Sequence, residues 1–240
     1  MGRGRKKRMA KRRIKQKQRR EIRMKMGKPV FFNLTRCNKP IPISSDRYNY
    51  KANMHKLRII KGSVITNVKY QASIITNCYF GNVHLNGIDF FNTNLRDTSF
   101  CNAALTDVVF FDCNLSGVDF TGAKLTNVVF MSANIRNTKG LVLNDTCKIY
   151  ATYPKLQIEE MLKNSLLSLA NDMRIFRYRV LHVNKNKLNF WSLNVLLDTF
   201  GDDMYRALSA LPQYRNRQHF FTHFFTLYSY KKYIEIFLQT

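Results

Sequence analysis

Residues 78–137, written five at a time, read CYFGN VHLNG IDFFN TNLRD TSFCN AALTD VVFFD CNLSG VDFTG AKLTN VVFMS ANIRN. The third residue of every group is Phe, Leu or Ile, and Phe alternates with Leu from Phe80 to Phe130. The same spacing continues backwards to Ser63 without a failure. The large apolar residues of the series are Ile65, Tyr70, Ile75, Phe80, Leu85, Phe90, Leu95, Phe100, Leu105, Phe110, Leu115, Phe120, Leu125, Phe130 and Ile135.

Neither regular secondary structure can bury every fifth residue. In an α-helix a five-residue step turns the side chain by about 140°, and in a strand an odd step reverses the face. A chain that turns a corner every five residues presents the same side of each group to a common axis. The residue two places before each large one is small or β-branched in most groups, and the residue two places after is mostly Asn, Asp or Gly, which favour turns.

The groups TNLRD at 93–97, CNLSG at 113–117 and ANIRN at 133–137 resemble the pentapeptide-repeat family. The resemblance covers about a third of the chain, residues 63–137. In that family four groups of five close one square, right-handed coil, so the resemblance implies a quadrilateral β-helix. Residues twenty apart then share a face, which would stack Phe80, Phe100 and Phe120 on one side and Phe90, Phe110 and Phe130 on the opposite side.

The expected fold class is therefore mainly β with α. We predict a basic arm over residues 1–28 that is disordered unless bound, a linker or N-terminal cap over 29–62, the solenoid over 63–140 and a small α-helical domain over 141–240. One expected role of the helices is to cover the open end of the solenoid. The helices are expected near Lys155–Ala170, Leu188–Phe200, Asp202–Leu211 and Arg217–Leu238.

One face of the predicted solenoid carries apolar residues on its outer side, which should not stay in contact with water. This apolar stripe consists of Phe91, Val109, Phe111, Val129 and Met131. Two interpretations stay open. Either the chain's own C-terminal helices cover the stripe, or it is the interface with a protein partner or with a second copy of the chain.

Charge is distributed very unevenly along the chain, whose formal net charge is +25. Residues 1–28 hold 15 Lys and Arg against one Glu, whereas residues 63–137 hold 4 basic and 5 acidic residues. A segment with such like-charge density cannot fold alone. The candidate nucleic-acid-binding residues are those of the arm: Arg3, Arg5, Lys6, Lys7, Arg8, Lys11, Arg12, Arg13, Lys15, Lys17, Arg19, Arg20, Arg23, Lys25 and Lys28.

The favoured function is a non-enzymatic, nucleic-acid-associated scaffold, with RNA preferred to DNA as the partner. The composition of the arm is similar to that of ribosomal-protein extensions, and also to that of histone-like arms and nuclear localisation signals. The alternatives are a protein-interaction module whose arm is a nuclear address or binds an anionic membrane, and a mitochondrial transit peptide. Some pentapeptide-repeat proteins interact with DNA gyrase by mimicking DNA with an acidic surface. Because this coil is near neutral and its flanks are basic, a gyrase-interacting DNA mimic is a minor alternative.

No catalytic residue, metal site or cofactor is predicted, because no nucleophile with a base and no glycine-rich phosphate loop is present. His219 and His223 have the spacing of metal ligands but lack an intervening Glu. The five cysteines are scattered, which favours an intracellular, reducing compartment, the cytoplasm first, with nuclear and organellar compartments as alternatives. No transmembrane helix is expected. Further basic residues with a solvated or phosphate-contacting role are Arg174, Arg177, Arg179, Lys185 and Lys187.

Overall fold

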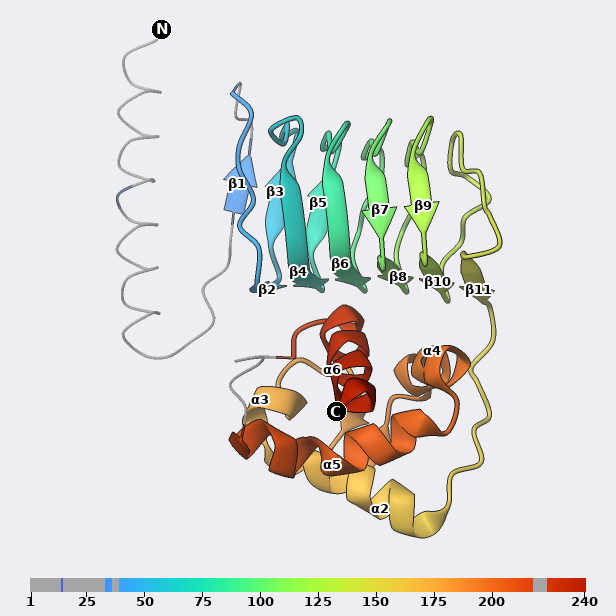
Figure 1. Cartoon of the computed structure of the whole chain (residues 1–240). Helices are drawn as coiled ribbons and strands as arrows, with labels where there is room; N and C mark the ends of the chain where they lie inside the picture. Colours follow the sequence, from blue (N-terminus) through green and yellow to red (C-terminus); the bar gives the residue numbers. More distant parts are fainter. Residues whose placement is uncertain (1–13, 15–32, 36–38, 218–223) are drawn as a thin grey trace, which may run out of the picture.

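The computed structural model describes residue 14 and residues 33–35, 39–217 and 224–240. A β-solenoid of about five turns spans residues 47–150, and a small helical region follows it (Figure 1). The eight-stranded sheet contains β2 (Arg47–Tyr50), β4 (Val64–Gln71), β6 (His84–Phe91), β7 (Ala104–Thr106), β8 (Val109–Phe111), β9 (Lys124–Thr126), β10 (Val129–Met131) and β11 (Lys148–Tyr150). A three-stranded sheet contains β1 (Asn33–Thr35), β3 (Asn53–His55) and β5 (Ile74–Thr76).

The strands of successive coils pair in parallel, and the register confirms the predicted twenty-residue coil. Ile65 pairs with Leu85, Tyr70 with Phe90, and Phe90 in turn with Phe110. The corner residues have left-handed backbone conformations, which Asn, Asp and Gly adopt at least cost. Corners of this kind include Asn77, Asn82, Gly87, Asn92, Asp97, Asn102, Asp107, Asp112, Gly117, Gly122 and Asn127.

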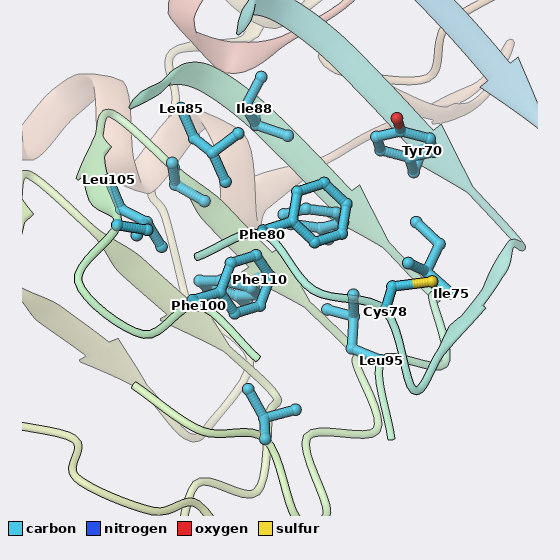
Figure 2. Close-up of a cluster of buried hydrophobic side chains, with 14 of the residues drawn as sticks. Tyr70, Ile75, Cys78, Phe80, Leu85, Ile88, Leu95, Phe100, Leu105 and Phe110 are labelled. Carbon is cyan, nitrogen blue, oxygen red and sulfur yellow. The ribbon is translucent and has the colours of Figure 1, made fainter. Parts of the chain in front are cut away.

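The core of the solenoid consists of the predicted ladders of stacked rings (Figure 2). The ring centroids of Phe80 and Phe100 lie 5.3 Å apart, and those of Phe100 and Phe120 lie 5.4 Å apart. On the opposite face Phe110 stacks on Phe130 at 5.2 Å. The two ladders meet edge to face across the interior, as Phe100 and Phe110 do at 6.1 Å. The Phe/Leu alternation of the sequence therefore stacks Phe on Phe in successive coils.

The solenoid is longer than the five-residue period indicates. Residues 39–62, predicted as a linker or cap, supply a further coil whose Ala52, Met54, Leu57 and Ile59 are buried. Its strand β2 pairs with β4 at an offset of 21 residues, because one extra residue lies between Ile59 and β4. At the other end β11 pairs with β10 at an offset of 19. A single insertion and a single deletion interrupt the period while the coil continues.

The helical region begins after an extended segment at 151–159. It comprises α2 (Glu160–Ser168), the 3-10 turn η1 (Leu169–Asn171), α3 (Met173–Phe176), the hairpin β12 (His182–Asn184) and β13 (Lys187–Leu188), α4 (Phe190–Phe200), α5 (Asp203–Arg217) and α6 (Leu227–Gln239). The helix predicted from Arg217 starts only at α6, where Thr226 forms a capping box with Ser229. The helix predicted to end at Leu211 continues to Arg217.

The helical region packs against one side of the solenoid, below β8 and β10 in Figure 1. The helices were expected to cover the open end of the solenoid. They do not cover its C-terminal end, since Val142 and Ile149 near that end stay exposed. The reason is the distribution of apolar surface. The helices bury the outward apolar residues Val109, Val129 and Met131 of β8 and β10.

Candidate functional site

The apolar stripe is covered by the helices of the same chain, which is the first of the two interpretations left open by the sequence. Val109, Val129 and Met131 are buried in a second hydrophobic core together with residues of α2, α4, α5 and α6. Phe111 stacks on Phe91 at 4.4 Å between ring centroids and meets the ring of Trp191 in α4 edge to face at 5.8 Å. We call the boundary between this solenoid face and the helices the seam.

Three polar contacts position the N-terminus of α6 on the seam. The Thr226 hydroxyl donates to Asn67 Oδ1 at 2.7 Å, and the Leu227 backbone N–H donates to Asp89 Oδ2 at 3.0 Å. Lys231 Nζ donates to Asp107 Oδ1 at 2.9 Å. A carboxylate at a helix N-terminus satisfies a free N–H group and interacts favourably with the helix dipole.

A buried ion pair lies in the same place. Lys69 Nζ is 3.9 Å from Asp89 Oδ2, and the side chains are 1% and 6% exposed. Burial raises the pKa of Asp89 to about 6, an effect that the Lys69 charge, the Leu227 N–H and the Lys231 charge oppose. Burial likewise lowers the pKa of Lys69 to about 8, against the attraction of Asp89. The seam is thus an apolar interface that contains a charged pair whose desolvation costs free energy.

The first coil of the solenoid is strongly basic and lies next to the arm in the sequence. Residues 39–62 contain six basic residues and one acid, and all six are exposed: Lys39, Arg47, Lys51, Lys56, Arg58 and Lys61. Within the described part of the chain, the ion pairs formed by Lys and Arg all lie at or beyond Lys69. Lys51 lies 5.3 Å from the ring centroid of Tyr50, and Arg58 lies 5.9 Å from that of Tyr79.

A second group of basic residues lies beside this coil, where two tyrosine rings are in contact. Tyr48 of β2 packs edge to face on Tyr178, which follows α3, with 5.0 Å between ring centroids. Arg177 and Arg179 flank Tyr178 in the sequence, and their charges act on the Tyr48 hydroxyl. Burial nevertheless raises the pKa of Tyr48 to about 12, with Arg177 and Arg179 opposing the rise.

The other predicted residues lie apart from this contact or outside the described residues. Arg174 forms an ion pair with Asp172 at 3.1 Å, and Lys185 and Lys187 are exposed on the β12–β13 hairpin. All fifteen basic residues of the arm lie outside the described residues, as do His219 and His223. The joint surface of β2 and the turn after α3 escaped sequence reasoning, although the excess of basic residues over 29–62 was a signal for half of it.

Neither a metal cluster nor a membrane span emerges from the described residues. Among them, no three His, Cys, Asp or Glu side chains gather as metal ligands would. No helix in the same ranges has the length and apolar character to cross a membrane.

Comparison with known proteins identifies the repeat. Residues 73–140 match the family model described as a pentapeptide repeat region. No curated protein matches the chain. Similar solved structures include a pentapeptide repeat protein from the cyanobacterium Cyanothece 51142, with 16% identity, a TM-score of 0.41, and coverage of 51% of this chain and 97% of that one.

Two further structures have lower TM-scores. HetL, a pentapeptide repeat protein involved in heterocyst differentiation regulation from a Nostoc cyanobacterium, is 15% identical, with a TM-score of 0.34 and coverage of 45% of this chain and 49% of its own. A pentapeptide repeat protein from the Arabidopsis thaliana thylakoid lumen is 17% identical, with a TM-score of 0.30 and coverage of 46% and 75%. At these values nothing about function is carried over to this chain.

Proposed function

We propose, on the premise that residues 73–140 form a pentapeptide repeat region, that this chain is a non-enzymatic scaffold that associates with nucleic acid, RNA in preference to DNA. The observation that carries the proposal is the separation of charge. The arm and the first coil are basic, and the six basic residues of 39–62 form no ion pair with any residue that the structure describes, whereas residues 63–137 are near neutral.

Basic side chains that gather at one end of a rigid body favour the binding of a polyanion. Each phosphate that Lys or Arg neutralises releases counterions, which supplies affinity without sequence specificity. The solenoid contributes stiffness, because its stacked rings and parallel strands fix every coil against the next. The result is a rigid neutral body with a cationic end.

The preference for RNA rests on the aromatic residues beside the cations. Tyr50 and Tyr79 each lie next to a basic side chain. Unpaired bases in RNA loops stack on such rings while the cations contact the backbone, an arrangement that a continuous DNA duplex does not permit. Phosphate contacts alone would give nearly equal affinities for DNA and RNA.

The test compares the full chain with a variant in which the fifteen basic residues of 1–28 are replaced by Gln, so that length is preserved. Binding to a single-stranded RNA of about 20 nucleotides, and to DNA of equal length, is measured across a salt series. Each phosphate contact contributes about −0.7 to the slope of log K against log salt concentration for single strands. The full chain should therefore show a steep slope that the variant largely loses.

Salt-insensitive binding, or no binding of the full chain at low salt, would sink the proposal. A variant that keeps its nucleic-acid affinity but no longer accumulates in the nucleus of a eukaryotic host cell would instead assign the arm to targeting. Binding to vesicles that contain phosphatidylserine, without binding to RNA or DNA, would assign it to a membrane surface.

A further inference from the structure

Two segments far apart in the sequence bring basic residues to one surface. Lys51 directly follows β2 and lies 5.3 Å from the ring centroid of Tyr50, and the turn after α3 contributes Arg177 and Arg179, whose charges act on the Tyr48 hydroxyl. We infer that this β2–α3 surface is a composite site for the phosphodiester backbone of a nucleic acid, held jointly by the solenoid and the helical region. The inference rests on the proposed function and adds a folded site to the arm.

The contact that joins the two segments is well buried and specific. Tyr178 is buried between Tyr48 of the solenoid and Phe225, whose ring centroid lies 4.7 Å away. The Tyr48 hydroxyl in turn donates to Gln71 Oε1 at 3.0 Å. The relative position of the two basic groups is therefore set by packing, and neither group is on a free loop tip.

Arg179 is held in a fixed position on this surface. Its backbone has φ 54°, a left-handed conformation that is costly for a residue with a side chain. Its guanidinium lies 3.7 Å from the ring centroid of Phe176 and donates to the Val183 carbonyl at 3.3 Å. A cation whose geometry is set before binding loses less freedom when it meets a phosphate.

The charges on this surface do not compensate each other internally. In the described part of the chain, the ion pairs involve none of Lys51, Arg177 and Arg179. The acid adjacent to β2, Asp46, accepts from Asn67 Nδ2 at 2.9 Å. Like charges around one contact repel one another, and a chain of phosphates relieves that repulsion.

The phosphodiester backbone fits this surface better than a single small anion does. The three cations come from two segments of the chain, and they border the aromatic pair Tyr48 and Tyr50, whose ring centroids are 6.5 Å apart. A strand that passes from the end of β2 to the turn after α3 would contact cations of both segments, which a single small anion would not.

The test uses the full chain with one substitution in each element, Lys51→Asn and Arg177→Gln, singly and together. Lys51 has φ 52°, which Asn adopts readily, so the corner should be preserved. Arg177 is exposed. The control is Lys124→Gln with Arg136→Gln, which removes the same charge from exposed positions on later coils that likewise form no ion pair within the described ranges. Thermal unfolding verifies that the variants fold alike.

With the single-stranded RNA probe at about 0.1 M salt, the double variant should bind about tenfold more weakly and lose about 1.4 from the salt slope. Each single variant should show part of the loss, and the control should change affinity less than about twofold. Equal losses in the double variant and the control, or a loss confined to one of the two singles, would overturn the joint site while leaving the proposed function intact. If the full chain itself binds no RNA, the proposed function and the joint site fail together.

Discussion

The two hydrophobic cores of this chain are built on different principles. The core of the solenoid is periodic and apolar, with Phe stacked on Phe at spacings of 5.2 to 5.4 Å between ring centroids. The core at the seam is aperiodic and contains the Lys69–Asp89 pair and the N-terminus of α6. The solenoid is therefore stabilised by repetition of one contact, whereas the seam depends on a few specific contacts that occur once each.

The largest effect is expected from the periodic core. Phe100→Ala removes a fully buried ring that stacks on both Phe80 and Phe120, and it should lower the free energy of unfolding by about 3 to 5 kcal/mol. Phe91→Ala is the matched control, because Phe91 is only half-buried, at the seam. Urea denaturation followed by far-UV circular dichroism measures both. An equal or larger loss for Phe91→Ala would show that the ladder is not the dominant core.

The next effect concerns the buried charges at the seam. Asp89→Asn keeps an acceptor for the Leu227 N–H but leaves Lys69 buried without its counter-charge, which should cost about 3 kcal/mol. The double variant Lys69→Met with Asp89→Asn should lie within about 1 kcal/mol of the wild type, since no isolated charge remains. The sole tryptophan, Trp191, contacts Phe111 at the seam, so its fluorescence reports this boundary.

Asp89→Asn should therefore shift the fluorescence transition to lower denaturant than the circular dichroism transition. Coincident transitions, or a double variant as unstable as the single one, would show that the ion pair has no special role at the seam.

A smaller effect is expected where a solenoid corner meets α6. Gly87 has φ 65°, and a Cβ built there would lie 2.3 Å from the ring of Tyr228. Gly87→Ala should cost about 2 to 3 kcal/mol, from the left-handed backbone and the displaced ring together. Gly62→Ala is the control, since Gly62 has φ 77° but nothing within 4 Å, and it should cost about 1 kcal/mol. Equal losses in both variants would show that Tyr228 does not pack closely on this corner.

The periodic core could be predicted because its information is local. Each group of five from Ser63 to Asn137 carries its own inward residues and its own corner, so the solenoid follows from the spacing. The ladders from Tyr70 to Phe130 follow once four groups form one coil, as the family resemblance implies. The first coil could not be found in this way. One extra residue between Ile59 and Val64 shifts the register, and only the pairing of β2 with β4 restores it.

The sequence predicts the presence of the helices better than the residues at which they begin and end. α4 lies where the apolar pattern indicates, whereas Phe224 and Phe225, expected inside the last helix, precede it. Thr226 ends the preceding extended segment, because its side chain and that of Ser229 cap α6 reciprocally. The same two aromatic residues are used instead to fill the second core.

Some features of the candidate site could likewise be predicted from the sequence, and others could not. Composition and the five-residue spacing predict a solenoid over residues 63–137, its near-neutral charge, the basic arm and the apolar stripe, and the family resemblance adds the four-sided coil. The sequence does not reveal that α4 and α6 cover the stripe, that the Lys69–Asp89 pair is buried beneath α6, or that Arg177 lies beside β2. These features depend on which surfaces of separate segments fit each other, and such shape complementarity leaves no periodic trace in the sequence.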